Sequence, residues 1–149
     1  DGGREKAPAA LTRKVIEAEL SGEHEIVIWG NGEQTRSFQY IDDCVKGTQM
    51  IMHSDIDYPI NLGSSELITI NELVDTVADI ASVELDREYD LTKPQGVDGR
   101  NSDNTKILDE LGWEPPTSFR DGIEITYEWI KAQMLEHRER EERSVFALP

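Results

Sequence analysis

The 149-residue sequence predicts a mixed α/β protein, or an α+β one if it is a piece of a longer chain. Stretches with apolar residues at helical spacing alternate with short β-branched or aromatic runs, and no internal repeat is found. The length suits one domain with its own core, and an apolar fraction of 37% suits a globular chain. The first residue is Asp rather than Met, as expected of a processed chain or a fragment.

The first part of the sequence predicts a helix followed by two extended segments. Pro8 suits the first turn of a helix, where its missing N–H costs nothing, and Ser21-Gly22 ends the apolar pattern. Residues 25–29 are β-branched or aromatic and predict a strand. A Gly-Asn-Gly hairpin turn at 30–32 leads to a second extended segment at 36–41.

The middle of the sequence predicts two further helices. Residues 42–52 form the first, with Asp42 as its N-cap. A short, buried strand is expected at 59–62. The capping box of residues 69–72 opens the next helix, and weak alternation at 84–90 predicts an edge strand.

The last part predicts a short helix and a longer one. Asp103 suits the N-cap of a helix that ends at Leu111-Gly112. Residues 118–121 cap a final helix, whose inward residues are expected to be Ile123, Tyr127, Ile130 and Met134. We expect a folded portion over residues 1–137 and a charged, mobile tail over residues 138–149.

The composition excludes several classes of function. The 31 Asp and Glu against 15 Lys and Arg give a formal net charge of −16, which disfavours nucleic acids and anionic membranes as partners. The single cysteine, Cys44, excludes an internal disulfide and a Cys-based zinc site. His24, His53 and His137 lack metal-ligand spacing. Neither an 18-residue apolar run nor a signal peptide is found, so we expect a cytoplasmic protein.

Catalytic motifs are weak in this sequence. The Tyr-x-x-x-Lys pattern of short-chain dehydrogenases occurs at Tyr89/Lys93 and Tyr127/Lys131. The first match precedes Pro94, which disfavours a helix, and the second lies on a core-facing side. The loop at 96–102 has only two of the three glycines of a dinucleotide fingerprint. We therefore assign no catalytic, cofactor-binding or metal-binding residue.

The positions of the positive charges indicate more about function than the catalytic motifs do. An acidic protein holds an anionic ligand only where it concentrates Arg and Lys, and screening over about 8 Å lets a local cluster override the net charge. Arg36 follows a tight turn and Arg100 lies in a Gly-rich loop before a helix. Arg suits bidentate phosphate binding, so these two are candidate ligand contacts. The alternative is a surface ion pair.

Five runs of residues carry a resemblance to a known family. They are GGREKAPAALTRK (2–14), WGNGEQTRSFQYIDDCVKG (29–47), NLGSSELITINEL (61–73), GRNSDN (99–104) and LGWEPPTSFRDGIEITYEWIK (111–131). In this order they resemble the C-terminal part of the extended short-chain dehydrogenase/reductases that act on nucleotide sugars. GGREKAPAA and GRNSDN resemble the GDP-mannose 3,5-epimerases in particular.

The resemblance implies a substrate-binding lobe plus the last helix and strand of an NAD-binding Rossmann domain whose other parts lie upstream. The complete enzyme would be a homodimeric isomerase that uses NAD and a nucleotide-diphosphate sugar of the GDP-mannose type. This chain alone would bind no NAD and be inactive. The residues implied to face the substrate are Glu5, Lys6, Ala7, Lys14, Gln34, Thr35, Arg36 and Arg100. Arg100 would reach the diphosphate from the side opposite Arg36.

Two other functions remain open. A sibling enzyme such as a UDP-glucuronate decarboxylase shares the QTRSFQY-type run. A stand-alone nucleotide-binding module without chemistry is the other alternative.

Overall fold

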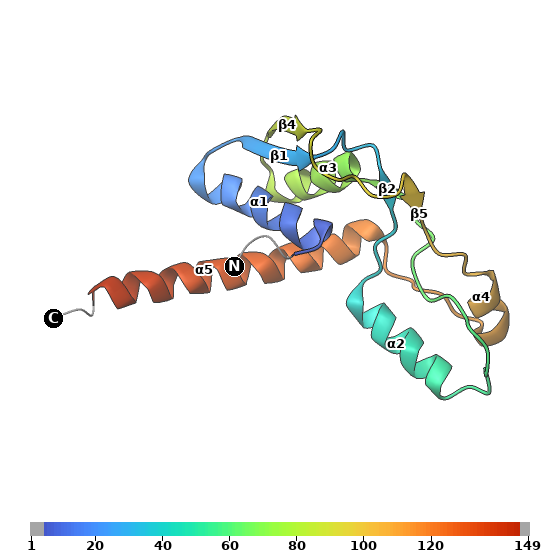
Figure 1. Ribbon diagram of the computed structural model, residues 1–149. Helices are drawn as coiled ribbons and strands as arrows, with labels where there is room; N and C mark the ends of the chain where they lie inside the picture. Colours follow the sequence, from blue (N-terminus) through green and yellow to red (C-terminus); the bar gives the residue numbers. More distant parts are fainter. Residues whose placement is uncertain (1–4, 147–149) are drawn as a thin grey trace.

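The computed structural model describes residues 5–146, which form five helices and five short strands (Figure 1). In chain order they are α1 (Ala7–Ser21), β1 (Glu25–Trp29), β2 (Thr35–Arg36), α2 (Ile41–Met52), β3 (Ile68–Thr69), α3 (Ile70–Ala81), β4 (Asp86–Asp90), β5 (Gly99–Arg100), α4 (Thr105–Leu111) and α5 (Phe119–Phe146). This mixed content confirms the predicted fold class. No helix of this described part is long and apolar enough to cross a membrane.

The strands form two small sheets. β1 and β4 pair in parallel over their full lengths. The second sheet has the order β3-β2-β5, with β2 antiparallel to β3 and parallel to β5. The predicted hairpin at residues 30–32 is therefore wrong, because β1 and β2 belong to different sheets. The turn itself is present, and Gly30 and Gly32 both have left-handed backbones.

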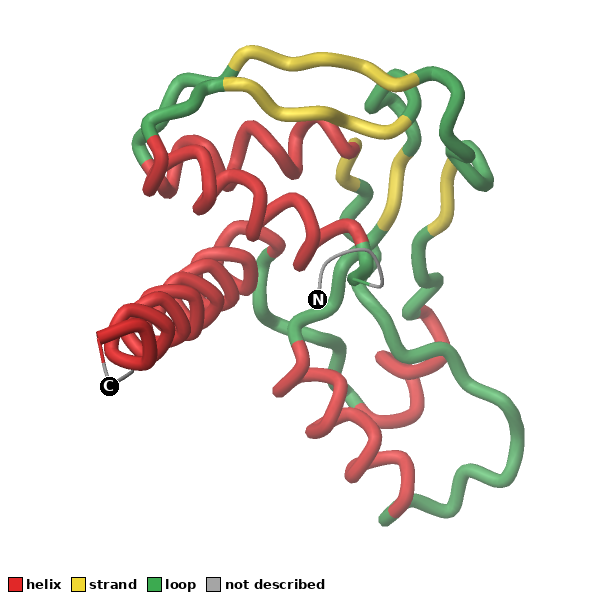
Figure 2. Tube along the Cα trace, turned by 60° about the vertical axis from the view of Figure 1, so that its left-hand side comes forward, coloured by secondary structure: helices red, strands yellow, loops and turns green. Residues whose placement is uncertain are grey.

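The core lies between the β1–β4 sheet and the helices α1, α3 and α5. Figure 2 shows the two long strands lying across α1 and α3, with α5 on the other side of these helices. Alternate residues of β1, Ile26 and Ile28, point into the core, where Val15, Leu73 and Tyr127 are also buried. The predicted inward face of the last helix is confirmed, since Ile123 and Tyr127 are buried and Ile130 and Met134 pack against the core.

Local capping signals were mostly correct. The Thr69 side chain accepts from the amide of Glu72 while the Glu72 carboxylate accepts from the amide of Thr69, which completes the predicted capping box. At the start of α5, the Ser118 hydroxyl accepts from the amide of Asp121. Asp103 accepts from the amide of Thr105 at the start of α4, although it lies one residue before the N-cap position.

Two expectations for residues 36–62 were wrong. α2 begins at Ile41, so Asp42 lies inside the helix rather than at its N-cap. The next residue, Asp43, is buried and accepts from the amide of Thr117 at 3.0 Å. Residues 59–62 form no strand, because a strand needs a hydrogen-bonded neighbour and none of the described segments pairs with them.

α5 is longer than its core-facing part. It continues without a break past residue 138, where the sequence predicted the start of a mobile tail. In Figure 1 its C-terminal end extends away from the rest of the molecule. Pairs one turn apart, including Glu136–Arg140 and Glu139–Arg143, line this segment. Such pairs each add a few tenths of a kcal/mol to a solvated helix. Mobility of residues 138–149 stays a prediction.

Candidate functional site

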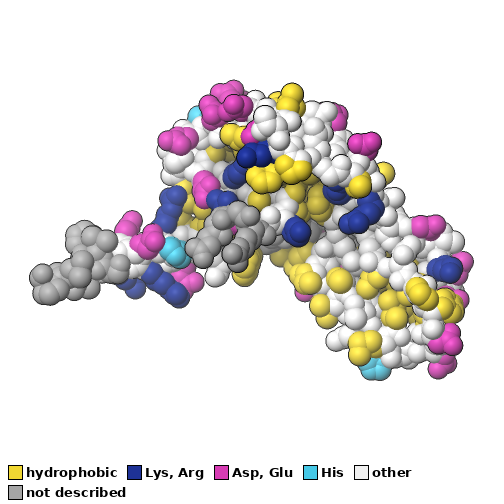
Figure 3. Space-filling view, viewed as in Figure 1, with side chains coloured by type: hydrophobic (Ala, Val, Ile, Leu, Met, Phe, Trp, Pro, Cys, Tyr) yellow, Lys and Arg dark blue, Asp and Glu magenta, His cyan; other side chains and the backbone are white. Residues whose placement is uncertain are grey.

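Two arginines lie side by side on the second sheet. The register of β2 and β5 pairs Arg36 with Arg100, so their backbones are about 4.8 Å apart. Paired residues of parallel strands direct their Cα–Cβ bonds to the same face of the sheet. The approach of Arg100 to the diphosphate from the side opposite Arg36 stays a prediction. Figure 3 shows Lys and Arg side chains gathered over β2 and β5.

The two guanidiniums differ in how they are held. Arg36 is half-buried and donates from Nη1 to the carbonyl of Thr35 at 2.6 Å and from Nη2 to the carbonyl of Gln95 at 3.3 Å. Arg100 is exposed, and its guanidinium has no partner among residues 5–146. Two like charges on neighbouring strands repel each other, so this arrangement favours an anion between them.

The loop between β4 and β5 positions Arg36. Gly96 has a φ of +76°, and a Cβ atom built on it would lie 3.2 Å from Nη2 of Arg36. The amide of Thr35 donates to the carbonyl of Asp98 at 2.8 Å, which anchors the end of this loop to β2. The sequence predicted a role for Arg100 in this loop and an incomplete dinucleotide fingerprint, but no contact of the loop with Arg36. Its Pro-Gln-Gly turn, residues 94–96, was the signal that the chain folds back here.

Three predicted substrate-facing residues lie at the start of α1. Lys6 occupies the N-cap position, is exposed, and has no side-chain partner within the described chain. Glu5 accepts a 2.9 Å hydrogen bond from Nε of Arg13, and this hydrogen bond, against the opposing effect of burial, raises the pKa of Arg13. Ala7 begins the helix and packs against the core. Of these three, Lys6 alone presents an unpaired charge.

The remaining predicted residues are held by backbone groups. The Lys14 ammonium donates to the carbonyl of Val27 at 2.8 Å, on the edge of β1. Gln34 donates from Nε2 to the carbonyl of Trp29 at 3.3 Å, while its Oε1 is buried with no partner in the described part. Thr35 is part of β2. Lys14 and Gln34 are therefore both held by carbonyl groups of β1.

The second Tyr-x-x-x-Lys match forms a half-buried link between helices α1 and α5. The Tyr127 hydroxyl donates to Glu19 at 2.5 Å, and the Lys131 ammonium donates both to Glu19 and, at 3.1 Å, to the Tyr127 hydroxyl. Burial alone would raise the pKa of Glu19, but the hydrogen bonds from Lys131 and Tyr127 outweigh it and lower that pKa. Burial and the bond to Glu19 raise the pKa of Tyr127, and the bonds to Glu19 and Tyr127 raise that of Lys131.

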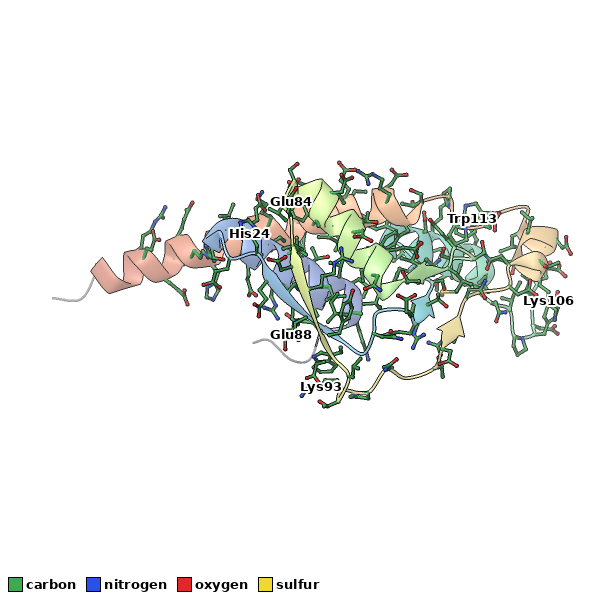
Figure 4. All side chains as sticks on the ribbon, turned by 90° about the horizontal axis from the view of Figure 1, so that it is seen from above. His24, Glu84, Glu88, Lys93, Lys106 and Trp113 are labelled. Carbon is green, nitrogen blue, oxygen red and sulfur yellow. The ribbon has the colours of Figure 1, made fainter. Side chains whose placement is uncertain are left out.

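The first match is not a pair at all. The Tyr89 hydroxyl donates to Asn71 at 3.1 Å, beneath the sheet. The Lys93 ammonium instead lies 5.6 Å from the ring centre of Trp29. Figure 4 shows Lys93 beyond the end of β4 that carries Glu88, far from Lys106 and Trp113 at the other side of the molecule. Tyr89 and Lys93 therefore contact different residues and do not form a Tyr–Lys pair.

The described residues do not fit a dinucleotide cofactor. A cradle for its phosphates needs a glycine turn that joins a strand to a helix N-terminus. Gly30 and Gly32 connect β1 to β2, and the side chains of Gln95 and Asn71 fill the space beside them. Gly96 and Gly99 lead into β5. Among residues 5–146, no group of three or more His, Cys, Asp or Glu could hold a metal ion.

Comparison with known proteins identifies the family. Residues 2–126 match the family described as GDP-mannose 4,6 dehydratase. The chain belongs to this family. The matched range contains all eight residues predicted to face the substrate.

Two relatives show which enzymes the chain resembles in sequence. GDP-mannose 3,5-epimerase 1 of Oryza sativa subsp. indica is 45% identical over 133 residues, which cover 89% of this chain and 34% of that protein. UDP-glucuronic acid decarboxylase 1 of Arabidopsis thaliana is 35% identical over 109 residues, covering 71% of this chain and 24% of that protein. The chain thus spans about a third or less of the length of these curated relatives.

A solved structure of an epimerase has a fold similar to that of this chain. A variant of UDP-glucuronic acid 4-epimerase from Bacillus cereus, in complex with UDP-4-deoxy-4-fluoro-glucuronic acid and NAD, is 28% identical with a TM-score of 0.72. The match covers 83% of this chain and 40% of that one. This member of the GDP-mannose 4,6 dehydratase family therefore matches less than half of that 4-epimerase chain.

Proposed function

We propose that the chain is the substrate-binding portion of an NAD-dependent nucleotide-sugar epimerase, of the GDP-mannose 3,5-epimerase type. The observation that carries this proposal is the pairing of Arg36 with Arg100 on neighbouring strands. Their guanidiniums hold the diphosphate of the substrate, and Lys6 adds a third positive charge at the start of α1. Arg suits this task because its planar fork matches two phosphate oxygens at once.

The role of this portion is positioning. The diphosphate is remote from the sugar carbons that react, so the arginines bind substrate and transition state alike. NAD belongs to other parts of the complete protein, and nothing in the chemistry is assigned to residues of this chain. Homodimer formation and a cytoplasmic location are part of the same proposal.

The test compares three variants of the complete protein. Arg36→Ala and Arg100→Ala are expected to raise the KM for GDP-mannose by about 10- to 150-fold, because each lost hydrogen bond to a charged group is worth about 1.5–3 kcal/mol. kcat should change less, because the lost contacts stabilise the bound substrate and the transition state equally. Arg120→Ala is the control, because Arg120 pairs with Asp79 on α3, outside the site. A KM unchanged in both test variants, with the fold intact, overturns the proposal.

Substrate competition separates the alternatives. The higher identity to the epimerase than to the decarboxylase supports GDP-mannose as substrate. Faster turnover of UDP-glucuronic acid by the complete protein would favour the decarboxylase instead. Binding of nucleotide without any turnover by the complete protein would favour a module without chemistry.

A further inference from the structure

The turn between β1 and β2 contains an Asn-Gly pair, residues 31–32, to which the proposed function gives no role. Asn31 is exposed, and its side-chain Oδ1 accepts a hydrogen bond from the amide of Glu33 at 3.1 Å. In such an Asx turn the side-chain carbonyl folds back over the peptide group that follows it. The Cγ atom of Asn31 is therefore held beside the backbone nitrogen of Gly32.

The fold requires glycine at the second position of this pair. Gly32 has a φ of +77°, and a Cβ atom built on it would lie 2.1 Å from Oδ1 of Asn71. Any side chain at this position would therefore be both strained and obstructed. The N–H of Gly32 donates to no group among residues 5–146. Its nitrogen is restrained neither by a side chain of its own nor by a hydrogen bond, while the carboxamide of Asn31 is open to water.

We propose that Asn31 is a site of spontaneous deamidation. The Gly32 nitrogen gives its proton to hydroxide and bonds to Cγ of Asn31, while the bond from Cγ to Nδ2 breaks and Nδ2 leaves as ammonia with a proton from water. One water molecule then opens the resulting succinimide ring. Opening at Cγ gives aspartate with a normal main chain, and opening at the backbone carbonyl gives isoaspartate, whose main chain runs through Cβ and Cγ.

The same turn caps the N-terminus of α3, so the modification has a structural consequence. The first amides of a helix have no partner within the helix itself. Here the amide of Asn71 donates to the carbonyl of Gly32 at 3.0 Å, and the amide of Ile70 donates to that of Gln34 at 3.3 Å. Aspartate at position 31 leaves the main chain and these bonds unchanged. Isoaspartate lengthens the main chain by one methylene directly before Gly32 and displaces the capping carbonyls from α3.

Incubation of the complete protein in mildly alkaline buffer, followed by peptide mass mapping, tests the site without any ligand. Asn61 is the matched control, because it is also exposed but precedes Leu62, whose side chain hinders attack by the backbone nitrogen. Asn31 should deamidate at least about tenfold faster than Asn61, a difference in barrier of about 1.4 kcal/mol. Asn31→Gln should remove the fast reaction, because the longer side chain has to close a six-membered ring. Equal rates at Asn31 and Asn61 overturn the proposal, as does a rate below about a tenth of that in a synthetic peptide of residues 28–34.

Residue-resolved hydrogen exchange on the incubated protein tests the consequence for α3. Isoaspartate is quantified by enzymatic methylation of its free α-carboxylate. The amides of Ile70 and Asn71 should exchange faster in molecules that carry isoaspartate, whereas the amide of Glu72, which donates to Oγ1 of Thr69 at 3.0 Å, keeps its protection. The variant Asn31→Asp should keep the protection of all three amides. Full protection of Ile70 and Asn71 beside isoaspartate, or its loss in Asn31→Asp, would contradict the assigned consequence.

Discussion

At the scale of single residues, the contact between Gly96 and Arg36 links backbone conformation to ligand binding. Gly96→Ala is expected to lower the free energy of unfolding by about 1–2 kcal/mol, because its φ of +76° disfavours a Cβ atom. The new methyl group also lies against the Arg36 guanidinium and displaces it. Affinity for GDP should therefore fall in the complete protein, as measured by titration calorimetry.

Gly22 provides the matched control. Its φ is +74°, but a Cβ atom there meets nothing within 4 Å. Gly22→Ala should show the same loss of stability in urea unfolding and keep the affinity for GDP. An equal loss of affinity in both variants would mean that Gly96 acts only through general stability.

At the scale of secondary-structure elements, the Glu19–Tyr127–Lys131 link ties α1 to α5. Lys131→Met removes two hydrogen bonds from a half-buried site and is expected to lower the free energy of unfolding by about 1–2 kcal/mol. Arg140→Met is the control on the same helix, because its partner Glu136 is exposed, and its effect should stay within about 0.5 kcal/mol. Equal effects in urea unfolding would show that the link contributes no more than a surface pair.

The same link predicts how stability depends on pH. The pKa of Glu19 is lowered on folding, so its contribution is present above its ordinary pKa of 4.5 and is lost as the pH falls through the folded value. The pKa of Lys131 is raised, so its contribution is complete below 10.5 and is lost as the pH rises through the folded value. Lys131→Met should flatten both limbs of the stability profile measured between pH 3 and 11. An unchanged profile would contradict this account.

At the scale of the whole molecule, the region from α2 to residue 62 has the least support from packing and strand pairing within the described chain. α2 exposes an apolar face, and residues 59–62 have no strand partner in the described part. In the chain alone we expect weak hydrogen-exchange protection over residues 42–62, or self-association through that face. α3, where Leu73, Val74 and Val77 are fully buried, is the internal reference. Protection in a strict monomer equal to that of α3 would count against the prediction.

Cofactor binding is also a property of the whole molecule. Within residues 5–146, the turns at Gly30, Gly32 and Gly96 lead into strands rather than helices, so they cannot present a row of amides to a pyrophosphate. We expect no NAD binding when the 149-residue chain is titrated by calorimetry, and NAD binding when the complete protein is used. Micromolar affinity in the chain alone would show that the cofactor site lies within it.

The sequence by itself determined the features that depend on a few neighbouring residues. Pro8 in the first turn of α1, the capping box of Thr69 and Glu72, and the left-handed Gly112 after α4 were all readable, because each involves groups within about four positions. The family was readable too, from runs of residues that keep their order along the chain.

The tertiary structure alone decided which distant residues meet. Thr35 reaches a loop residue 63 positions away, and the strand pairing places Arg36 beside Arg100. Tyr127 contacts Glu19 across 108 positions, so a motif that resembles a catalytic pair forms a half-buried link between two helices. Strand pairing and side-chain partners depend on how the whole chain packs, so neither spacing nor local propensity contains them.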